Sequence, residues 1–180
     1  MRVMGLDPGS RRTGWGVVER RARGLHFVAA GHVAPPARLA LPARLHAIAT
    51  ELGRVMDLHA PECVVIEAAF HHAFARSTLV LGHVRGALMV AAMERGLEVA
   101  EYAPRAIKLA VTGRGGAAKH QVAAMVKVRL GLAALPQADA GDALAGALCH
   151  LQRVRFDAPR RRTAANDRLL ALLATARGGR

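Results

Sequence analysis

Hydrophobic and polar positions along the first part of the chain follow the pattern of short strands. Apolar runs bounded by turn residues cover Arg2–Asp7, Trp15–Glu19 and Leu25–Val33. Arg23-Gly24 lies where a hairpin turn is expected between the second and third runs. Because the three runs follow one another through short turns, the pattern predicts an antiparallel meander.

The period then changes to that of a helix. Apolar residues recur three and four positions apart and predict a helix that ends before Pro61: Leu41, Leu45, Ile48, Leu52, Val55 and Met56. The apolar run within Glu62–Glu67 is of strand length, and its helical flanks place it in the centre of a parallel sheet. Further helices are predicted at 77–94, from Pro104, and at 118–130 and 139–152, with a strand at 98–102. This order predicts an α/β fold with a mixed five-stranded sheet flanked by helices.

Composition and charge indicate one domain with a basic end. The 180 residues fit a single domain, for which we expect bounds of 1–156, followed by a flexible tail at 157–180. Eight arginines against two aspartates lie between Arg153 and Arg180, and Leu169–Leu173 is the only stretch there with a short amphipathic pattern. The formal net charge of +13 favours a nucleic-acid partner, although arginine enrichment through base composition would produce the same excess.

Cysteine content and hydropathy predict a cytoplasmic protein that does not associate with membranes. Cys63 and Cys149 form no spaced framework and are expected to be buried, reduced thiols. The first strand begins at residue 2, so we expect no signal peptide. The longest apolar run, Thr78–Met93, contains His83 and Arg85 and is too short to span a bilayer.

Four acidic residues occur where the surrounding sequence is apolar. Asp7 and Glu67 each end an apolar strand, and Asp139 and Asp142 lie three apart on an Ala-rich helix. That spacing places the two aspartates on one helix face, about 5–6 Å apart. Two carboxylates so close repel by roughly 3 kcal/mol at an effective dielectric constant of about 20. A hard divalent cation such as Mg²⁺ or Mn²⁺ would remove that repulsion, and two such ions serve phosphodiester hydrolysis.

Each acid also has a simpler interpretation. Asp7 precedes Pro8-Gly9 and fits a turn, Asp139 fits a helix N-cap, and Asp142 fits a first-turn acid favoured by the helix dipole. Glu67 is harder to explain this way, because glutamate is depleted in strands. A strand, an aspartate and a Gly-rich turn also open the phosphate site of actin-like ATPases and sugar kinases. That class needs a longer chain and a second glycine-rich motif, and the sequence has neither.

Five segments, in order and in register, resemble the RuvC family of Holliday junction resolvases. They are Gly5-Leu-Asp-Pro-Gly-Ser-Arg-Arg-Thr-Gly-Trp-Gly16, Val65-Ile-Glu-Ala-Ala-Phe70, Leu81-Gly-His-Val-Arg-Gly86, Ala118-Lys-His-Gln-Val122 and Pro136-Gln-Ala-Asp-Ala-Gly-Asp-Ala-Leu-Ala145. The resemblance implies a ribonuclease H-like fold and a homodimer. It further implies symmetric paired nicks in four-way junction DNA during recombination and repair, and cooperation with a branch-migration complex.

The resemblance also implies roles for individual residues. The four acids would bind two Mg²⁺ or Mn²⁺ ions and activate a water, which leaves 5′-phosphate ends. Phe70 would stack on a base at the junction centre, worth roughly 1–3 kcal/mol, with Phe74 as a second candidate. Lys108 and Lys119 would lie near the phosphate that is cut. Arg76 completes the set of DNA-binding candidates.

Two departures from the family pattern limit these expectations. The stretch His71-His72-Ala73-Phe74-Ala75 lacks the lysine and asparagine found in relatives, so the cleavage preference stays open. The end beyond Phe156 is longer and more basic than the family core. Three other functions stay open at this stage: another ribonuclease H-like nuclease, a non-catalytic DNA-binding module, and the actin-like phosphotransferase. Gly82 and Gly86, which share a helix face, suit either a dimer interface or packing within the chain.

Overall fold

The computed structural model describes residues 1–68 and 75–154, with side chains in the second range from Ser77 onward. Five strands form one sheet: β1 (Arg2–Asp7), β2 (Thr13–Arg21), β3 (Gly24–Val33), β4 (Cys63–Glu67) and β5 (Glu98–Tyr102). Their order across the sheet is β3-β2-β1-β4-β5. β1, β2 and β3 pair antiparallel, whereas β1 with β4 and β4 with β5 pair parallel. The predicted meander and the mixed five-stranded sheet are therefore both confirmed.

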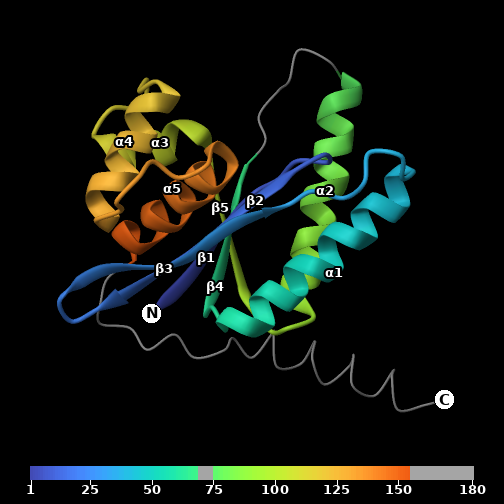
Figure 1. Ribbon diagram of the computed structural model, residues 1–180, viewed down its shortest axis with the longest axis horizontal. Helices are drawn as coiled ribbons and strands as arrows, with labels where there is room; N and C mark the ends of the chain where they lie inside the picture. Colours follow the sequence, from blue (N-terminus) through green and yellow to red (C-terminus); the bar gives the residue numbers. More distant parts are fainter. Residues whose placement is uncertain (69–74, 155–180) are drawn as a thin grey trace.

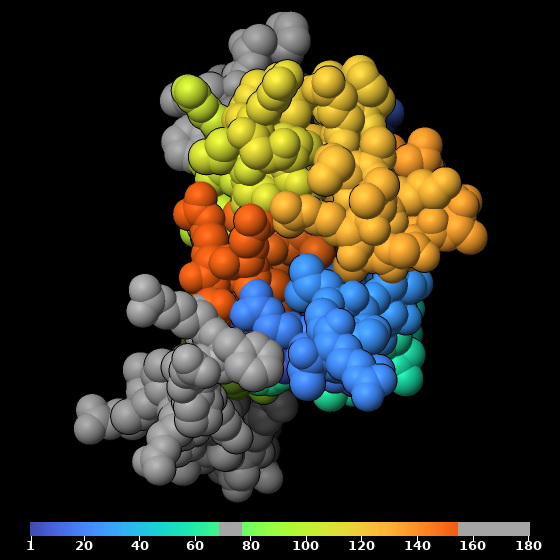
Figure 2. Space-filling model, turned by 90° about the vertical axis from the view of Figure 1, so that its left-hand side faces the viewer, coloured from blue at the N-terminus to red at the C-terminus, as the bar shows by residue number. Residues whose placement is uncertain are grey.

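In the described part of the chain, five helices cover the two faces of this sheet (Figure 1). α3, α4 and α5 lie on one face, and α1 and α2 lie on the other. Their bounds are α1 (Leu41–His59), α2 (Ala75–Met93), α3 (Pro104–Thr112), α4 (Lys119–Leu130) and α5 (Ala138–Arg153). Figure 2 views the molecule from the side where α3, α4 and the segment leading to α5 form the surface beside the β2–β3 hairpin.

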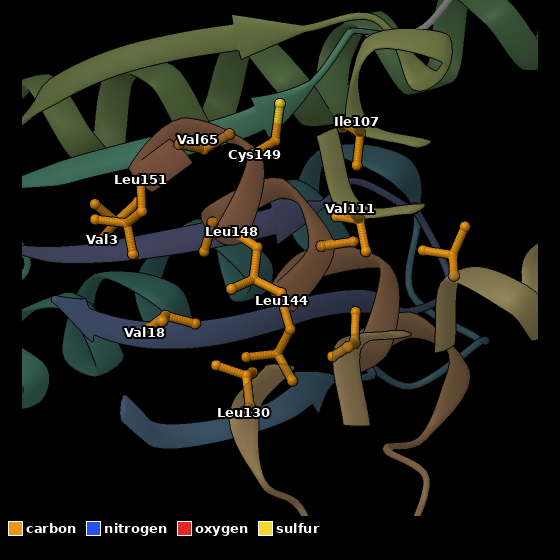
Figure 3. Close-up of a cluster of buried hydrophobic side chains, with 14 of the residues drawn as sticks. Val3, Val18, Val65, Ile107, Val111, Leu130, Leu144, Leu148, Cys149 and Leu151 are labelled. Carbon is orange, nitrogen blue, oxygen red and sulfur yellow. The ribbon is translucent and has the colours of Figure 1, made fainter. Parts of the chain in front are cut away.

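Two aliphatic cores hold these layers together. On the α5 face, Val3, Val18 and Val65 of the sheet meet Leu144 and Leu148 of α5 (Figure 3). On the opposite face, buried residues of β1 and β4 pack against α1 and α2; they include Met4, Ile66, Ile48, Leu52, Val84 and Leu88. Alternate residues of each central strand thus enter opposite cores, as expected for a strand covered on both faces.

The largest difference from the predicted elements is the length of β2. The strand begins at Thr13 and ends at Arg21, because its polar ends continue the ladder with β3, where Arg20 faces Leu25 and Arg21 faces Gly24. Gly24 has φ +124°, a conformation suited to glycine, and completes the hairpin turn. Hydrophobic pattern alone misses residues that a strand gains through backbone pairing.

The helices agree more closely than β2 with the bounds predicted from the hydrophobic pattern. α1 has proline in its first turn and ends at His59; its C-cap residue, Ala60, has a left-handed conformation directly before Pro61. No helix in the described part of the chain is both long and apolar enough to cross a membrane. The tail predicted at 157–180, including Leu169–Leu173, lies outside the described residues.

Candidate active site

Two of the four acids lie side by side at the ends of neighbouring central strands. β1 and β4 run parallel with Leu6 opposite Ile66, so Asp7 and Glu67 follow at the same level. Val65 contributes to the core on the α5 face, and Glu67, two residues later, projects to that same face. The parallel register therefore directs both carboxylates towards the helix that carries the other two acids.

Glycines in β1 and β2 allow α5 to come close to these carboxylates. A Cβ atom at Gly5 would lie 1.8 Å from the carbonyl oxygen of Ala143. One at Gly14 would lie 2.1 Å from the carbonyl oxygen of Asp139. Any larger residue would push the first turns of α5 away from the sheet. Close contact between helix and sheet is therefore what brings the α5 acids to Asp7.

A pocket of about 330 Å³ lies where these elements meet. Of the described residues, three contribute carboxylates to its lining: Asp7, Glu67 and Asp142. Another three contribute cationic side chains: Arg85, Lys108 and Lys119. The remaining wall is largely apolar and includes Leu81, Ile107, Val122 and Ala145. The pocket thus combines hard oxygen ligands with cations suited to a phosphate.

Burial and mutual repulsion raise the pKa values of two acids. Burial, together with the charges of Asp142, Glu67 and Asp139, raises the pKa of Asp7 to about 7. The pKa of Glu67 is raised by burial and by Asp142, against the opposing effect of Lys119 and Lys108. The ionised forms of both strand acids are therefore disfavoured, and a bound cation would favour them.

The two α5 acids already have cationic partners. The Lys119 Nζ atom lies 3.1 Å from Oδ2 of Asp142, and this contact raises the pKa of Lys119. The Arg12 Nη1 atom lies 3.5 Å from Oδ2 of Asp139. Surface pairs of this kind contribute about 0–1 kcal/mol, so a stronger partner can replace them.

The helix-cap interpretation of Asp139 is wrong. Residue Gln137 occupies the N-cap position of α5 and makes no side-chain cap bond, while Asp139 belongs to the first turn. Asp139 is also absent from the lining of the pocket, because its carboxylate turns towards Arg12. The structure therefore brings three of the four predicted acids into the pocket and leaves the fourth near it, where its charge still acts on Asp7.

The donor set suits a hard divalent cation in chemistry and in charge. Carboxylate oxygens are the ligands that Mg²⁺ and Mn²⁺ prefer, and a cation at the strand ends would favour the ionised form of Asp7, whose pKa is raised by burial and by the neighbouring acids. Among residues 1–68 and 75–154, however, no three His, Cys, Asp or Glu side chains are grouped closely enough to hold a metal ion as they stand. A metal ion bound by these acids would compete with Lys119 for Asp142 and with Arg12 for Asp139.

The predicted DNA-binding residues divide into two groups. Lys108 and Lys119 both line the pocket that contains the acids. Phe70 and Phe74 lie outside the described residues, and Arg76 falls in the first turn of α2 but its side chain is not described. Sequence reasoning missed Arg85 and Arg12 as members of the site. A lone arginine within the apolar helix 77–94 was the available signal for Arg85.

The pocket of acids lies at the ends of central strands of a mixed sheet, and α5 packs closely against glycines of that sheet. This combination is typical of the class of ribonuclease H-like α/β nucleases. Comparisons with known proteins agree with this class. Residues 3–150 match the family model described as Crossover junction endodeoxyribonuclease RuvC. The chain belongs to this RuvC family.

Individual relatives support the assignment over most of the chain. A protein of the same name from Koribacter versatilis (strain Ellin345) is 53% identical over 154 residues, covering 84% of this chain and 92% of the relative. Another from Rhodopseudomonas palustris (strain BisA53) is 46% identical over 150 residues, covering 83% and 86%. The solved structure of T. thermophilus RuvC in complex with Holliday junction substrate is similar with a TM-score of 0.79 and 35% identity, covering 84% and 93%. The ribonuclease H-like fold is thereby confirmed.

Proposed function

We propose that this chain is a Holliday junction resolvase, an endonuclease that makes symmetric paired nicks in four-way DNA junctions during recombination and repair. The observation that carries the proposal is the pocket of three carboxylates in which burial and repulsion raise the pKa of Asp7 to about 7. Membership of the RuvC family supports the choice of substrate, since one similar structure is that of T. thermophilus RuvC with a Holliday junction substrate.

The acids would hold the metal ions that the reaction requires. Asp7, Glu67 and Asp142 would bind Mg²⁺ or Mn²⁺, with Asp139 joining them after it leaves Arg12. A pair of such ions supplies charge stabilisation at the phosphodiester and a nucleophilic water at neutral pH. Asp7 must lose its proton to act as a ligand, so metal binding at this residue is favoured above about pH 7.

The chain's own side chains would bind and orient the DNA strand. Lys108 and Lys119 lie in the same pocket as the acids and would bind the phosphate that is cut. Lys119 would first have to leave its partner Asp142. Leu81, Ile107 and Val122 form an apolar wall that limits the access of water. Phe70 and Phe74 would stack on unpaired bases, and Arg76 would bind the backbone beside them.

A homodimer belongs to the same proposal, with α2 as its interface. Leu79 and Val90 on this helix are 63% and 60% exposed. Gly82 and Gly86 are exposed too, and a Cβ atom on either would meet no described atom within 4 Å. Close packing against the described part of the chain therefore does not require either glycine. A second copy suits this face, because two acid pockets related by a two-fold axis match the near two-fold symmetry of a four-way junction.

Three further expectations belong to the proposal. The family resemblance implies a branch-migration complex that would deliver the junction. Cysteine content and hydropathy predict that the protein would act in the cytoplasm, and composition and charge predict a nuclease domain that would end near residue 156. The basic segment 157–180 would add phosphate contacts, each of which steepens the salt dependence of binding by about 0.9 log units.

Cleavage of labelled DNA tests the proposal. A synthetic four-way junction, a linear duplex of matching sequence and an RNA–DNA hybrid would be incubated with Mg²⁺, Mn²⁺ or EDTA. Wild type should nick two opposed strands of the junction only with metal, and Asp7→Asn should lower the rate by at least about 100-fold. Cutting of the hybrid instead would assign another nuclease function, and junction binding without cutting would leave a binding module.

A further inference from the structure

Arg85 is a pocket residue to which none of the steps above gives a role. It projects from α2 into the wall of the acid pocket, together with Leu81 one turn earlier. Its Nη2 atom forms an ion pair with Oε1 of Glu101 on the edge strand β5. The arginine side chain is 21% exposed and the glutamate 40%, so the cation is the more buried partner. The pair thus holds a positive charge at the pocket and leaves its carboxylate nearer the solvent.

The guanidinium of Arg85 keeps unused hydrogen-bonding capacity. Guanidinium groups carry five N–H donors in a planar fork, and the contacts of Arg85 in the described part of the chain involve Glu101 alone. Its Nε atom is buried without a hydrogen-bond partner among the described residues. A buried donor that lacks a partner is unfavourable, and an acceptor entering the pocket would remove that cost. The acceptor must be an anion or a strongly polar oxygen.

Charge in the pocket indicates which anion this would be. Lys119 is paired with Asp142, and the charge of Lys108 acts on Glu67. Glu101, in contrast, does not line the pocket, so Arg85 is the cation there whose partner is not a pocket acid. Arginine binds phosphate oxygens through two parallel hydrogen bonds more readily than lysine does. A DNA phosphate that reaches the acids enters the pocket that Arg85 also lines.

We propose that Arg85 binds a phosphate of the DNA strand that enters the acid pocket, next to the phosphate that is cut. Glu101 orients the guanidinium for this contact from the side away from the pocket. The inference rests on the proposed function and adds to it a contact on the α2 wall, in addition to those of Lys108 and Lys119. A purely structural alternative exists, in which the pair only fastens α2 to β5.

The two roles of Arg85 predict different behaviour for Glu101. If the pair is only a structural link, removing either end has the same effect. If Arg85 binds phosphate, Glu101→Gln keeps the cation in place, whereas Arg85→Met removes it. The two variants delete opposite ends of one ion pair, so they serve as matched controls for stability.

Junction binding measured in EDTA over a series of salt concentrations separates these cases. Arg85→Met should bind roughly tenfold more weakly, with a slope of log affinity against log salt that is shallower by about 0.9. Glu101→Gln should keep the slope of wild type. Arg85→Lys, which retains charge, should also keep the slope while losing affinity, and it provides the test if the methionine variant fails to fold.

Equal losses of affinity in Arg85→Met and Glu101→Gln, both with the slope of wild type, would overturn the inference. If wild type cuts junctions and this result is found, the resolvase proposal stands and only the role of Arg85 fails. If wild type neither prefers nor cuts junctions, the resolvase proposal fails first and the inference fails with it.

Discussion

At the scale of single residues, Asp7 is the least favourable charge of the site. In the unfolded chain its pKa takes the ordinary value of 3.8, whereas burial and the neighbouring acids raise it to about 7 in the folded protein. Between these values the unfolded chain gives up a proton that the folded protein keeps. Without metal, therefore, the free energy of unfolding should fall as the pH rises from about 4 to about 7.

Replacing this carboxylate should stabilise the metal-free protein. We expect Asp7→Asn to raise the melting temperature in EDTA at pH 8 by roughly 2–8 °C, and much less at pH 5. Asp142→Asn is the matched control: it also removes a negative charge, but it deprives Lys119 of its partner, so its gain should be smaller. A melting temperature for Asp7→Asn equal to that of wild type at pH 8 would contradict the predicted repulsion.

The sequence singled out the four acids as candidates for the site, but it did not single out the arginines around them. Asp7 and Glu67 are exceptional because each ends an apolar strand, and Asp139 and Asp142 because they share a helix face. An arginine such as Arg85 or Arg12 is one of many in a chain with 26 basic residues. Only the packing of α2 against β5 shows that Arg85 reaches the pocket. Residue type alone does not carry that information.

At the scale of elements, the glycines of β1 and β2 decide how near α5 lies to the sheet. Sequence reasoning noted Gly5 and Gly14 within a motif but did not predict that both face α5. Their role depends on a contact between segments more than 120 residues apart, which hydrophobic periodicity does not reveal. The helix and strand patterns predicted which elements form, and the glycine contacts determine the distance between them.

α2 is the element on which dimer formation depends in our proposal. Gly86→Arg places a long charged side chain on its exposed face, where a Cβ atom would meet no described atom within 4 Å, so the fold should be retained. The dimer should weaken at least about tenfold, because a charge would be buried at the interface. Light scattering coupled to size-exclusion chromatography would measure this.

A control on another helix makes this measurement specific. Leu58→Arg places the same charge on α1, at a residue that is also strongly exposed, and it should leave the dimer intact. A monomeric wild type, or a dimer that Gly86→Arg leaves unchanged, would exclude α2 as the interface.

At the scale of the whole molecule, the sequence predicted the fold class, the strand pairing directions and the five helices. It could not predict the polar ends of β2, which depend on pairing with β3. It also could not predict that Asp139 turns away from the pocket towards Arg12, since that choice is made by side-chain geometry in the folded protein. The hydrophobic pattern of the sequence thus determines the layers of helices and sheet. Competition among charged side chains determines which partners the acids of the site have.

The central claim is that acid pockets on two copies of the chain cut a four-way junction together. Cutting of a supercoiled plasmid with an extruded cruciform tests this most directly, because paired nicks give linear DNA and single nicks give open circles. With Mg²⁺ and limiting protein, wild type should produce linear DNA without accumulating open circles, and Asp7→Asn should produce neither. Accumulation of open circles alone, or equal cutting of a plasmid without the cruciform, would contradict the account.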